Sequence, residues 1–315
     1  PGSNRNASEG TMPDAALSYC AQEVRRHDPE RFLTCLFAPA DRREALFALY
    51  AFNQEVAKTR AIVSEPLLGE IRLTWWREAI AEIYEGTPRQ HAVVQALAEA
   101  VRAHDLPRAP FERLIEARGQ DLQPEPPADL PALLDYADGT AGTLTDLCLS
   151  ALGGVERQAE IARAAGIAVA LTGLLRALPF HAREHWVNLP ASLMDTHGVG
   201  LRELYDLKPG AGLKPVVESV ADSARAHLAE ARSLRRHVPK RAVAALLHVA
   251  GDAEERLDAV RGVLARHPAV EGGASAWNGL LHARLVSRAG FALRAALVDL
   301  LQFLRGQPMP RAWMC

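Results

Sequence analysis

Cysteine pairs, long apolar runs and a large net charge of either sign are all missing from this 315-residue chain. The four cysteines form no CxxC pair and no metal-ligand spacing, which excludes a disulfide scaffold and a zinc module and is typical of a reducing compartment. The 36 basic and 38 acidic residues leave a formal net charge of −2. This balance argues against nucleic acid as a partner.

Apolar segments long enough to cross a membrane are also lacking in the sequence. A spanning helix needs about 18 or more apolar residues, and the nearest candidate, 164–175, is bracketed by Arg163 and Arg176. We interpret this segment as a buried core helix. The polar residues 1–12 contain no apolar signal segment and are predicted to be a disordered leader or tag. We therefore expect a cytoplasmic protein, with peripheral contact at the inner membrane as an open alternative.

Alternating runs of β-branched and aromatic residues, the pattern of strands, are scarce, and aromatic residues make up only 6% of the chain. Apolar residues instead recur every three or four positions, which is the helical period. The prediction is one all-α domain over residues 13–315. Its predicted helices cover 43–56, 66–86, 88–105, 109–120, 130–152, 157–184, 213–237, 239–250, 253–266 and 291–305.

One local motif indicates metal chemistry. His181, Glu184 and His185 match the H-x-x-E-H signature, in which two histidines one helical turn apart share a zinc ion. Pro179 is expected to kink the helix just before this segment. Because no partner glutamate is evident, we favour chance occurrence over a metalloprotease, and we predict no metal and no cofactor.

The adjacent Trp75 and Trp76 are a second candidate feature. Such a pair suits a ligand platform, but its helical spacing from apolar neighbours favours a place in the core. Neither feature identifies a function by itself.

Three stretches read together resemble the squalene/phytoene synthase family. Residues 48–61 (ALYAFNQEVAKTRA) are similar to its first signature helix, and residues 136–142 (YADGTAG) to its second conserved segment. Residues 166–190, beginning GIAVALTGLLR and ending NLP, are similar to its second signature helix. The resemblance implies the isoprenoid synthase fold, a helical bundle around a central cavity.

Active members of the family carry two aspartate-rich motifs on facing helices, and these hold magnesium ions that grip a prenyl diphosphate. Carboxylates one turn apart on a helix share hard cations well. In this chain both motifs are degenerate. The first has Asn53, Gln54, Ala57, Lys58 and Ala61, and the second has Ala170, Gly173, Arg176, Ala177 and His181.

With residues 50–57 (YAFNQEVA) and 71–80 (IRLTWWREAI), the chain resembles more strongly the non-catalytic branch of the family, which is required for assembly of respiratory complex I. Subunits or assembly proteins of complex I are then the expected partners, and an isoprenoid or other lipid is a further candidate ligand. The alternative is a prenyltransferase that condenses isoprenoid diphosphates with an altered active site.

The resemblance also predicts the surroundings of the degenerate motifs. The apolar stripe of the first helix is expected to continue through Ala57 to Ala61 and to face the stripe of the second helix across a persistent apolar cavity. Arg176 is expected to point inward, where a buried cation needs an acidic partner or an anionic ligand head group. Asp121 and Asp146 are the acidic partners that we expect for it.

Overall fold

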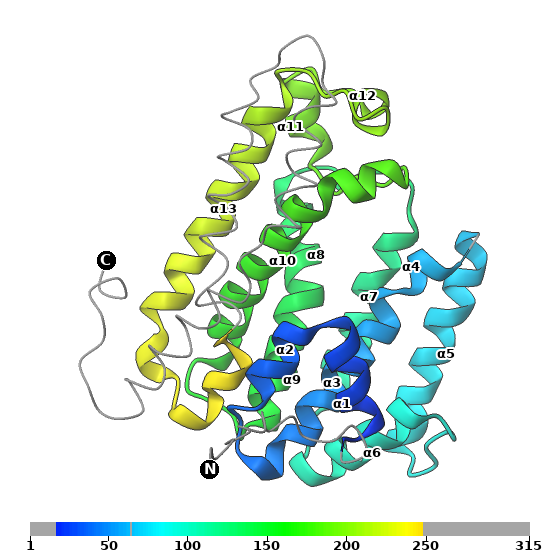
Figure 1. The fold of residues 1–315 in the computed structure, drawn as a ribbon, viewed down its shortest axis with the longest axis vertical. Coiled ribbons are helices and arrows are strands. Elements are labelled where there is room, and N and C mark those ends of the chain that lie inside the picture. The colour runs from blue at the N-terminus through cyan, green and yellow to red at the C-terminus, as the bar shows by residue number, and fades with distance from the viewer. Residues whose placement is uncertain (1–16, 64, 248–315) are drawn as a thin grey trace, which may run out of the picture.

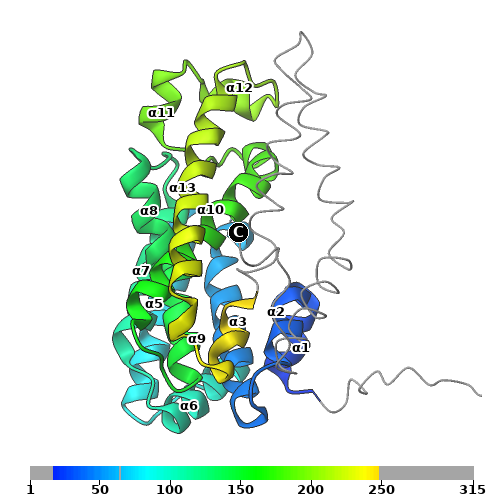
Figure 2. The ribbon, with the colours of Figure 1, turned by 90° about the vertical axis from the view of Figure 1, so that its left-hand side faces the viewer.

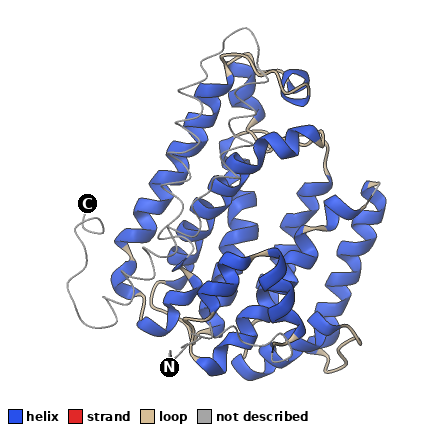
Figure 3. Ribbon diagram, in the orientation of Figure 1, coloured by secondary structure: helices blue, strands red, loops and turns tan. Residues whose placement is uncertain are grey.

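The computed structural model describes residues 17–63 and 65–247, and this part of the chain contains helices and loops but no strand (Figure 3). The all-α prediction is confirmed. The predicted leader and the predicted helices 253–266 and 291–305 lie outside the described residues. The α-helices are α1 (Tyr19–His27), α2 (Pro29–Cys35), α3 (Arg43–Ala57), α4 (Thr59–Ile62), α5 (Pro66–Tyr84), α6 (Ala92–His104), α7 (Arg108–Arg118), α8 (Leu130–Ala137), α9 (Thr143–Ala151), α10 (Gln158–Arg183), α11 (Ala191–Thr196), α12 (Leu201–Tyr205) and α13 (Leu213–Ser233).

Local capping chemistry explains where several helices begin. The hydroxyl of Ser18 accepts a hydrogen bond from the Ala21 amide at the start of α1. The carboxylate of Asp28 accepts a hydrogen bond from the Arg31 amide at the start of α2. Pro29 occupies the first position of this helix. Side chains of this kind satisfy amides that have no partner inside the helix. The apolar period of the sequence does not indicate either of these short helices, although their cap residues are visible in the sequence.

The predicted helix 130–152 is present as one helical run with an insertion. A π-helical turn (Asp138–Gly142) separates α8 from α9. A Cβ on Gly166 of α10 would lie 2.2 Å from the amide nitrogen of Gly142, so only glycine allows the two backbones to approach this closely. The turn therefore brings the α8–α9 run into direct backbone contact with α10.

Two of the predicted helices differ from the structure in the C-terminal part of the described chain. The expected helix 213–237 ends at Ser233 and is followed by a 3-10 turn (Arg235–His237). The expected helix 239–250 is a 3-10 segment (Lys240–Ala245) in the described residues. Further 3-10 turns precede α3 (Ala40–Arg42) and follow α7 (Gly119–Leu122).

Helix α10 is the centre of the bundle. It packs along α13 and against α9 and the π-helical turn (Figures 1 and 2). By length and composition α10 could cross a membrane, but 61% of its most apolar 18-residue window is buried inside the protein, as expected of a core helix. Pro179 lies within α10, and in Figure 1 the last turns of α10 run in a different direction from the rest.

The apolar core has two main parts. The larger cluster joins α1, α3, α5, α6, α7 and α9 around buried aromatic side chains such as Phe52, Trp76 and Phe111. The second joins α8, the C-terminal half of α10, and α11–α13 around Leu171, Leu175 and Val216. The two degenerate motifs belong to different parts of this core, because the first runs from the end of α3 into α4 and the second is on α10.

Candidate functional site

The first degenerate motif is at the end of α3. Asn53 is buried, and Gln54 and Ala57 are half-buried. The helix ends at Ala57, Lys58 occupies its C-cap, and the short helix α4 begins at Thr59. The stripe therefore does not continue to Ala61 as the sequence analysis expected, because Ala61 is exposed on a separate helix.

Lys58 does not face the interior. Its ammonium pairs with the carboxylate of Glu55, which also accepts a hydrogen bond of 2.6 Å from Arg72 on α5. The two cations share one acceptor at the edge of the molecule. This segment thus provides no free carboxylate where the resemblance would place the first metal ligands.

The second degenerate motif forms a half-buried stripe on α10. Ala170, Gly173, Ala177 and His181 are separated by three or four residues, which places them along one helical face. A Cβ added to Gly173 would meet no atom within 4 Å, whereas a Cβ at Gly166 would clash with backbone. The middle of the stripe thus faces open space, and the other end of α10 is tightly packed.

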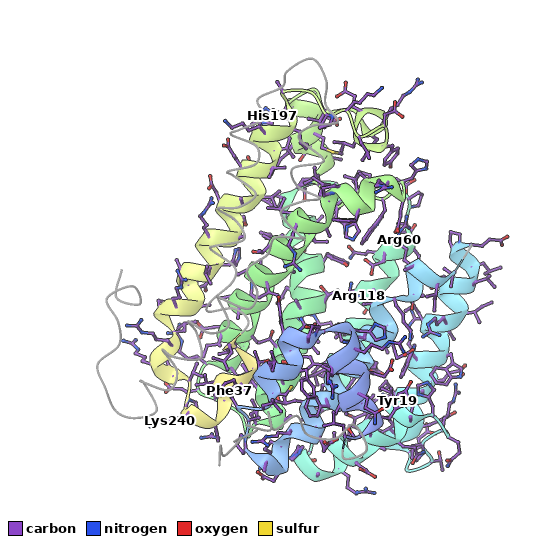
Figure 4. All side chains as sticks on the ribbon, in the orientation of Figure 1. Tyr19, Phe37, Arg60, Arg118, His197 and Lys240 are labelled. Carbon is purple, nitrogen blue, oxygen red and sulfur yellow. The ribbon has the colours of Figure 1, made fainter. Side chains whose placement is uncertain are left out.

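Arg60 links the two motif regions. Its guanidinium donates a 3.0 Å hydrogen bond to the backbone carbonyl of Asp121 and lies 5.1 Å from the centre of the Trp186 ring. Trp186 in turn lies 4.3 Å from the ring of His181 (Figure 4 labels Arg60). The segment after α3 therefore contacts the end of α10 through a cation and two rings, a contact the sequence analysis did not foresee. Nothing in the sequence pairs Arg60 with Trp186, since the two are far apart in the chain.

Beside Arg60 is a buried polar triad. Arg118 donates to the Asp121 carboxylate (3.2 Å) and to the Tyr136 hydroxyl (2.9 Å), and the Tyr136 hydroxyl donates to Asp121 (2.7 Å). Burial raises the pKa of Tyr136, so its hydroxyl stays protonated and remains a donor. The positive charge of Arg118 is matched inside the protein by Asp121.

The two carboxylates expected beside Arg176 both accept hydrogen bonds from other residues. Asp121 belongs to the triad, and the carboxylate of Asp146 accepts a 2.8 Å hydrogen bond from Gln158. Arg176 itself is half-buried on α10. The sequence could not anticipate these pairings, because each depends on which helices lie together.

The zinc interpretation does not fit the local geometry. Helix α10 ends at Arg183, and His185 has a left-handed backbone (φ 54°), so the three motif residues do not share a helical face. His185 packs on Tyr205 at 4.8 Å, away from the ring pair of His181 and Trp186. Among the described residues no group of three His, Cys, Asp or Glu side chains could hold a metal ion.

His181 is electrostatically unusual. Burial, with a further contribution from Arg60, lowers its pKa to about 4, and it is therefore neutral at physiological pH. A neutral imidazole beside an arginine is a poor ligand for magnesium, which prefers oxygen. With alanine at positions 57, 61 and 177, the residues present do not fit the magnesium ions of the active enzymes.

The tryptophan pair is structural. Trp76 is fully buried and makes edge contacts with Phe52 (5.5 Å) and His91 (5.5 Å). Trp75 is half-buried under the guanidinium of Arg89 at 5.2 Å. The core interpretation of the pair thus agrees with the structure.

Four buried side-chain atoms near the motifs have no hydrogen-bond partner among the described residues. They are Nε2 of Gln54, Oγ1 of Thr59, Nε of Arg118 and Nδ2 of Asn188. An unpartnered buried donor costs about 1–3 kcal/mol. Three of the four are N–H groups and the fourth is a hydroxyl that can also donate, so this region suits a neutral or anionic acceptor rather than a metal cation.

Comparisons with known proteins agree with this geometry. The family model described as squalene/phytoene synthase matches residues 24–297. The bovine protein "NADH dehydrogenase (ubiquinone) complex I, assembly factor 6" is 32% identical over 242 residues, covering 76% of this chain and 73% of the relative. Its human counterpart is 31% identical over 248 residues, covering 78% and 74%. The squalene synthase HpnC from Alicyclobacillus acidocaldarius has a similar structure, with a TM-score of 0.69 at 23% identity over 77% of this chain and 92% of that one. This last likeness shows the fold alone.

Proposed function

Because this chain belongs to the squalene/phytoene synthase family, we propose that it is a non-catalytic member that acts as an assembly factor of respiratory complex I. The relatives that carry the name of complex I assembly factor 6 match most of its length. One observation carries the non-catalytic part of the proposal. Where the enzymes have metal-binding carboxylates, this chain has Ala57, Ala61, Ala177 and a neutral His181.

The expected partners are subunits or assembly proteins of complex I, which would bind to the surface of the helical bundle. The test is deletion of the gene in its host, followed by native gel electrophoresis of the membranes and assay of NADH:quinone activity. We expect loss of assembled complex I, with succinate oxidation as the unaffected control. Restoration by the wild-type gene supports the assembly role, and normal complex I in the deletion strain contradicts it.

The rival activity, condensation of isoprenoid diphosphates, has a direct assay. The purified protein is incubated with farnesyl or geranylgeranyl diphosphate and magnesium, and the products are extracted and analysed. Each 1.36 kcal/mol of lost transition-state stabilisation slows a reaction about tenfold, and the missing carboxylates remove several such increments. We expect no squalene or phytoene above the protein-free control, and product above that level would establish the enzyme.

A second candidate function, binding an amphiphilic ligand without chemistry, is favoured by the open space at Gly173 and the unpartnered donors. The space would accommodate apolar groups, and the donors would meet a polar head. Gly173→Leu would fill the space, and Ala159→Leu on the exposed side of the same helix is the matched control. Mass spectrometry of lipid extracts should show a copurifying lipid lost only in Gly173→Leu. Equal lipid content in both variants, or none in the wild type, argues against this function.

A further inference from the structure

Exposed apolar side chains are concentrated at one place in the described part of the chain. Six large apolar residues are exposed in this part of the chain, and four of them fall within positions 62–71. These four are Ile62 (55% exposed), Leu67 (67%), Leu68 (46%) and Ile71 (58%). We call these four residues the apolar tip.

The apolar tip is held on a firm base. On α4, Thr59 is buried and Arg60 is fixed by its bond to the Asp121 carbonyl. On α5, Gly69 is buried so closely against Leu122 that a Cβ would lie 2.5 Å from that side chain. The apolar tip therefore cannot turn inward without breaking these contacts.

The apolar tip is also on the outside of the helix pair. The buried face of α5 carries Gly69, Leu73, Trp76 and Ile80, at the spacing of one helical stripe. Leu67, Leu68 and Ile71 are off this stripe. Helix α4 and the start of α5 form an outlying corner of the described structure (Figure 1).

The size and charge of the apolar tip indicate what kind of partner it binds. Four half-exposed aliphatic side chains present roughly 400 Å² of apolar surface, the scale of one functional patch. A stable protein interface needs about 800 Å² on each partner. The neighbouring cations Lys58 and Arg72 both pair with Glu55, and Arg60 is engaged by the Asp121 carbonyl and the Trp186 ring. Glu65 and Glu70 add negative charges, so no free basic patch surrounds the apolar tip. A small apolar surface of balanced charge fits the interfacial layer of a lipid bilayer, where binding strength scales with the apolar area that is buried.

We propose that the apolar tip inserts into a bilayer surface and docks the protein peripherally on a membrane. Because Arg60 joins α4 to Trp186, docking at this corner would also bring the candidate site close to the lipid. Insertion is apolar in origin, and we therefore expect it to depend little on anionic lipid or on salt. The proposal does not rest on the assembly role.

The test is flotation of the full-length protein with vesicles. Two compositions are used, phosphatidylcholine alone and phosphatidylcholine mixed with phosphatidylglycerol, each at low and high salt. The double variant Leu67→Ser/Ile71→Ser removes two residues of the apolar tip, and Tyr19→Ser/Leu36→Ser removes two similarly exposed residues elsewhere. We expect the wild type and the control variant to float with both compositions, and the tip variant to partition at least about tenfold less, equivalent to one 1.4 kcal/mol step.

Several outcomes overturn the proposal. These are wild-type protein that stays in solution, a tip variant that floats as well as the control variant, and flotation only with anionic lipid at low salt. A dimer seen by light scattering and abolished in the tip variant, without vesicle binding, would assign the surface to a second copy of the chain. Thermal melts verify that both variants are folded.

A site-specific probe gives an independent readout. Leu68→Cys in a Cys315→Ser background is labelled with an environment-sensitive dye, and Cys20, Cys35 and Cys148 are buried. Added phosphatidylcholine vesicles should shift the emission to the blue at position 68. A Leu36→Cys control should show no shift. Equal behaviour of the two labelled proteins contradicts insertion at the apolar tip.

Discussion

Arg60 is the residue that connects the two degenerate motifs in this structure. It lies in the segment that follows α3, and its guanidinium reaches the Asp121 carbonyl and the face of Trp186. A cation over an aromatic ring contributes about 0.5–2 kcal/mol, depending on how well it is shielded from water. This chain thus has a positively charged contact beside both degenerate motifs.

Arg60→Gln should therefore lower the unfolding free energy by about 1–2 kcal/mol, because the neutral side chain loses the cation–ring contact and is two bonds too short to replace the terminal nitrogen at the Asp121 carbonyl. Lys58→Gln, two residues away, is the control, since its exposed ion pair with Glu55 is of the class that contributes about 0–1 kcal/mol. Urea titration followed by tryptophan fluorescence measures both. If the two variants are equally stable, Arg60 does not hold α4 in place.

His181 should make stability depend on pH. An unfolded histidine titrates near 6.5, whereas the folded pKa is about 4. Between these values the unfolded chain binds a proton that the folded protein does not, so the unfolding free energy falls as the pH falls from 6.5 towards 4.

We expect this histidine to account for about 2 kcal/mol of that fall. In His181→Gln the slope should be shallower but not zero, because burial also lowers the pKa of His91 and His104. Unfolding titrations at several pH values compare the two proteins. Identical slopes would show that His181 titrates normally in the folded protein.

At the scale of elements, α10 combines a tightly packed half and an open half. Gly166 in the first half meets the backbone of the π-helical turn, and Gly173 in the second faces no neighbouring atom. A single helix thus carries two internal glycines with opposite packing environments. The open half is the one that carries the second degenerate motif.

Alanine substitutions at these glycines should have opposite effects. Gly166→Ala must push α10 away from Gly142 and should cost about 3 kcal/mol or more. Gly173→Ala adds a better helix former in open space and should stabilise the protein by about 0.5–1 kcal/mol. Thermal melting distinguishes the two variants, since the melting temperature should fall in Gly166→Ala and rise in Gly173→Ala. Destabilisation by both would mean that the space at Gly173 is occupied.

At the scale of the whole molecule, the two motif segments belong to different parts of the core. The first is at the end of α3, which packs against α1, α6 and α9, and the second is on α10, which packs against α9 and α13. Arg60 and Trp186 join the segments at one end. Within the described residues the region between them offers N–H donors and small side chains in place of a cluster of carboxylates.

Magnesium should therefore leave the melting temperature of the protein unchanged. A ligand that binds only the folded state at 100 times its dissociation constant adds about 2.7 kcal/mol of stability, so binding would be easily seen. Melts with magnesium chloride, with chelator, and with sodium chloride at matched ionic strength give the comparison. An upward shift specific to magnesium would contradict the site described above.

The sequence by itself determined the helical class, because apolar periodicity is a local property of the chain. It predicted α3, α5, α10 and the start of α13 to within a few residues. It did not predict α1, α2, α11 and α12, since a helix of one or two turns shows too little of the period and forms through capping and packing. The resemblance to the squalene/phytoene synthase family, read from the same sequence, predicts where both degenerate motifs lie, and this assignment stays a prediction.

Only the tertiary structure decided how these positions meet. The break of α3 at Lys58 places Ala61 outside the site, and the end of α10 at Arg183 separates His181 from His185. The contact of Arg60 with Trp186 joins segments distant in the sequence. Such contacts depend on how whole helices pack against one another, a long-range balance of burial and backbone approach that no local pattern encodes.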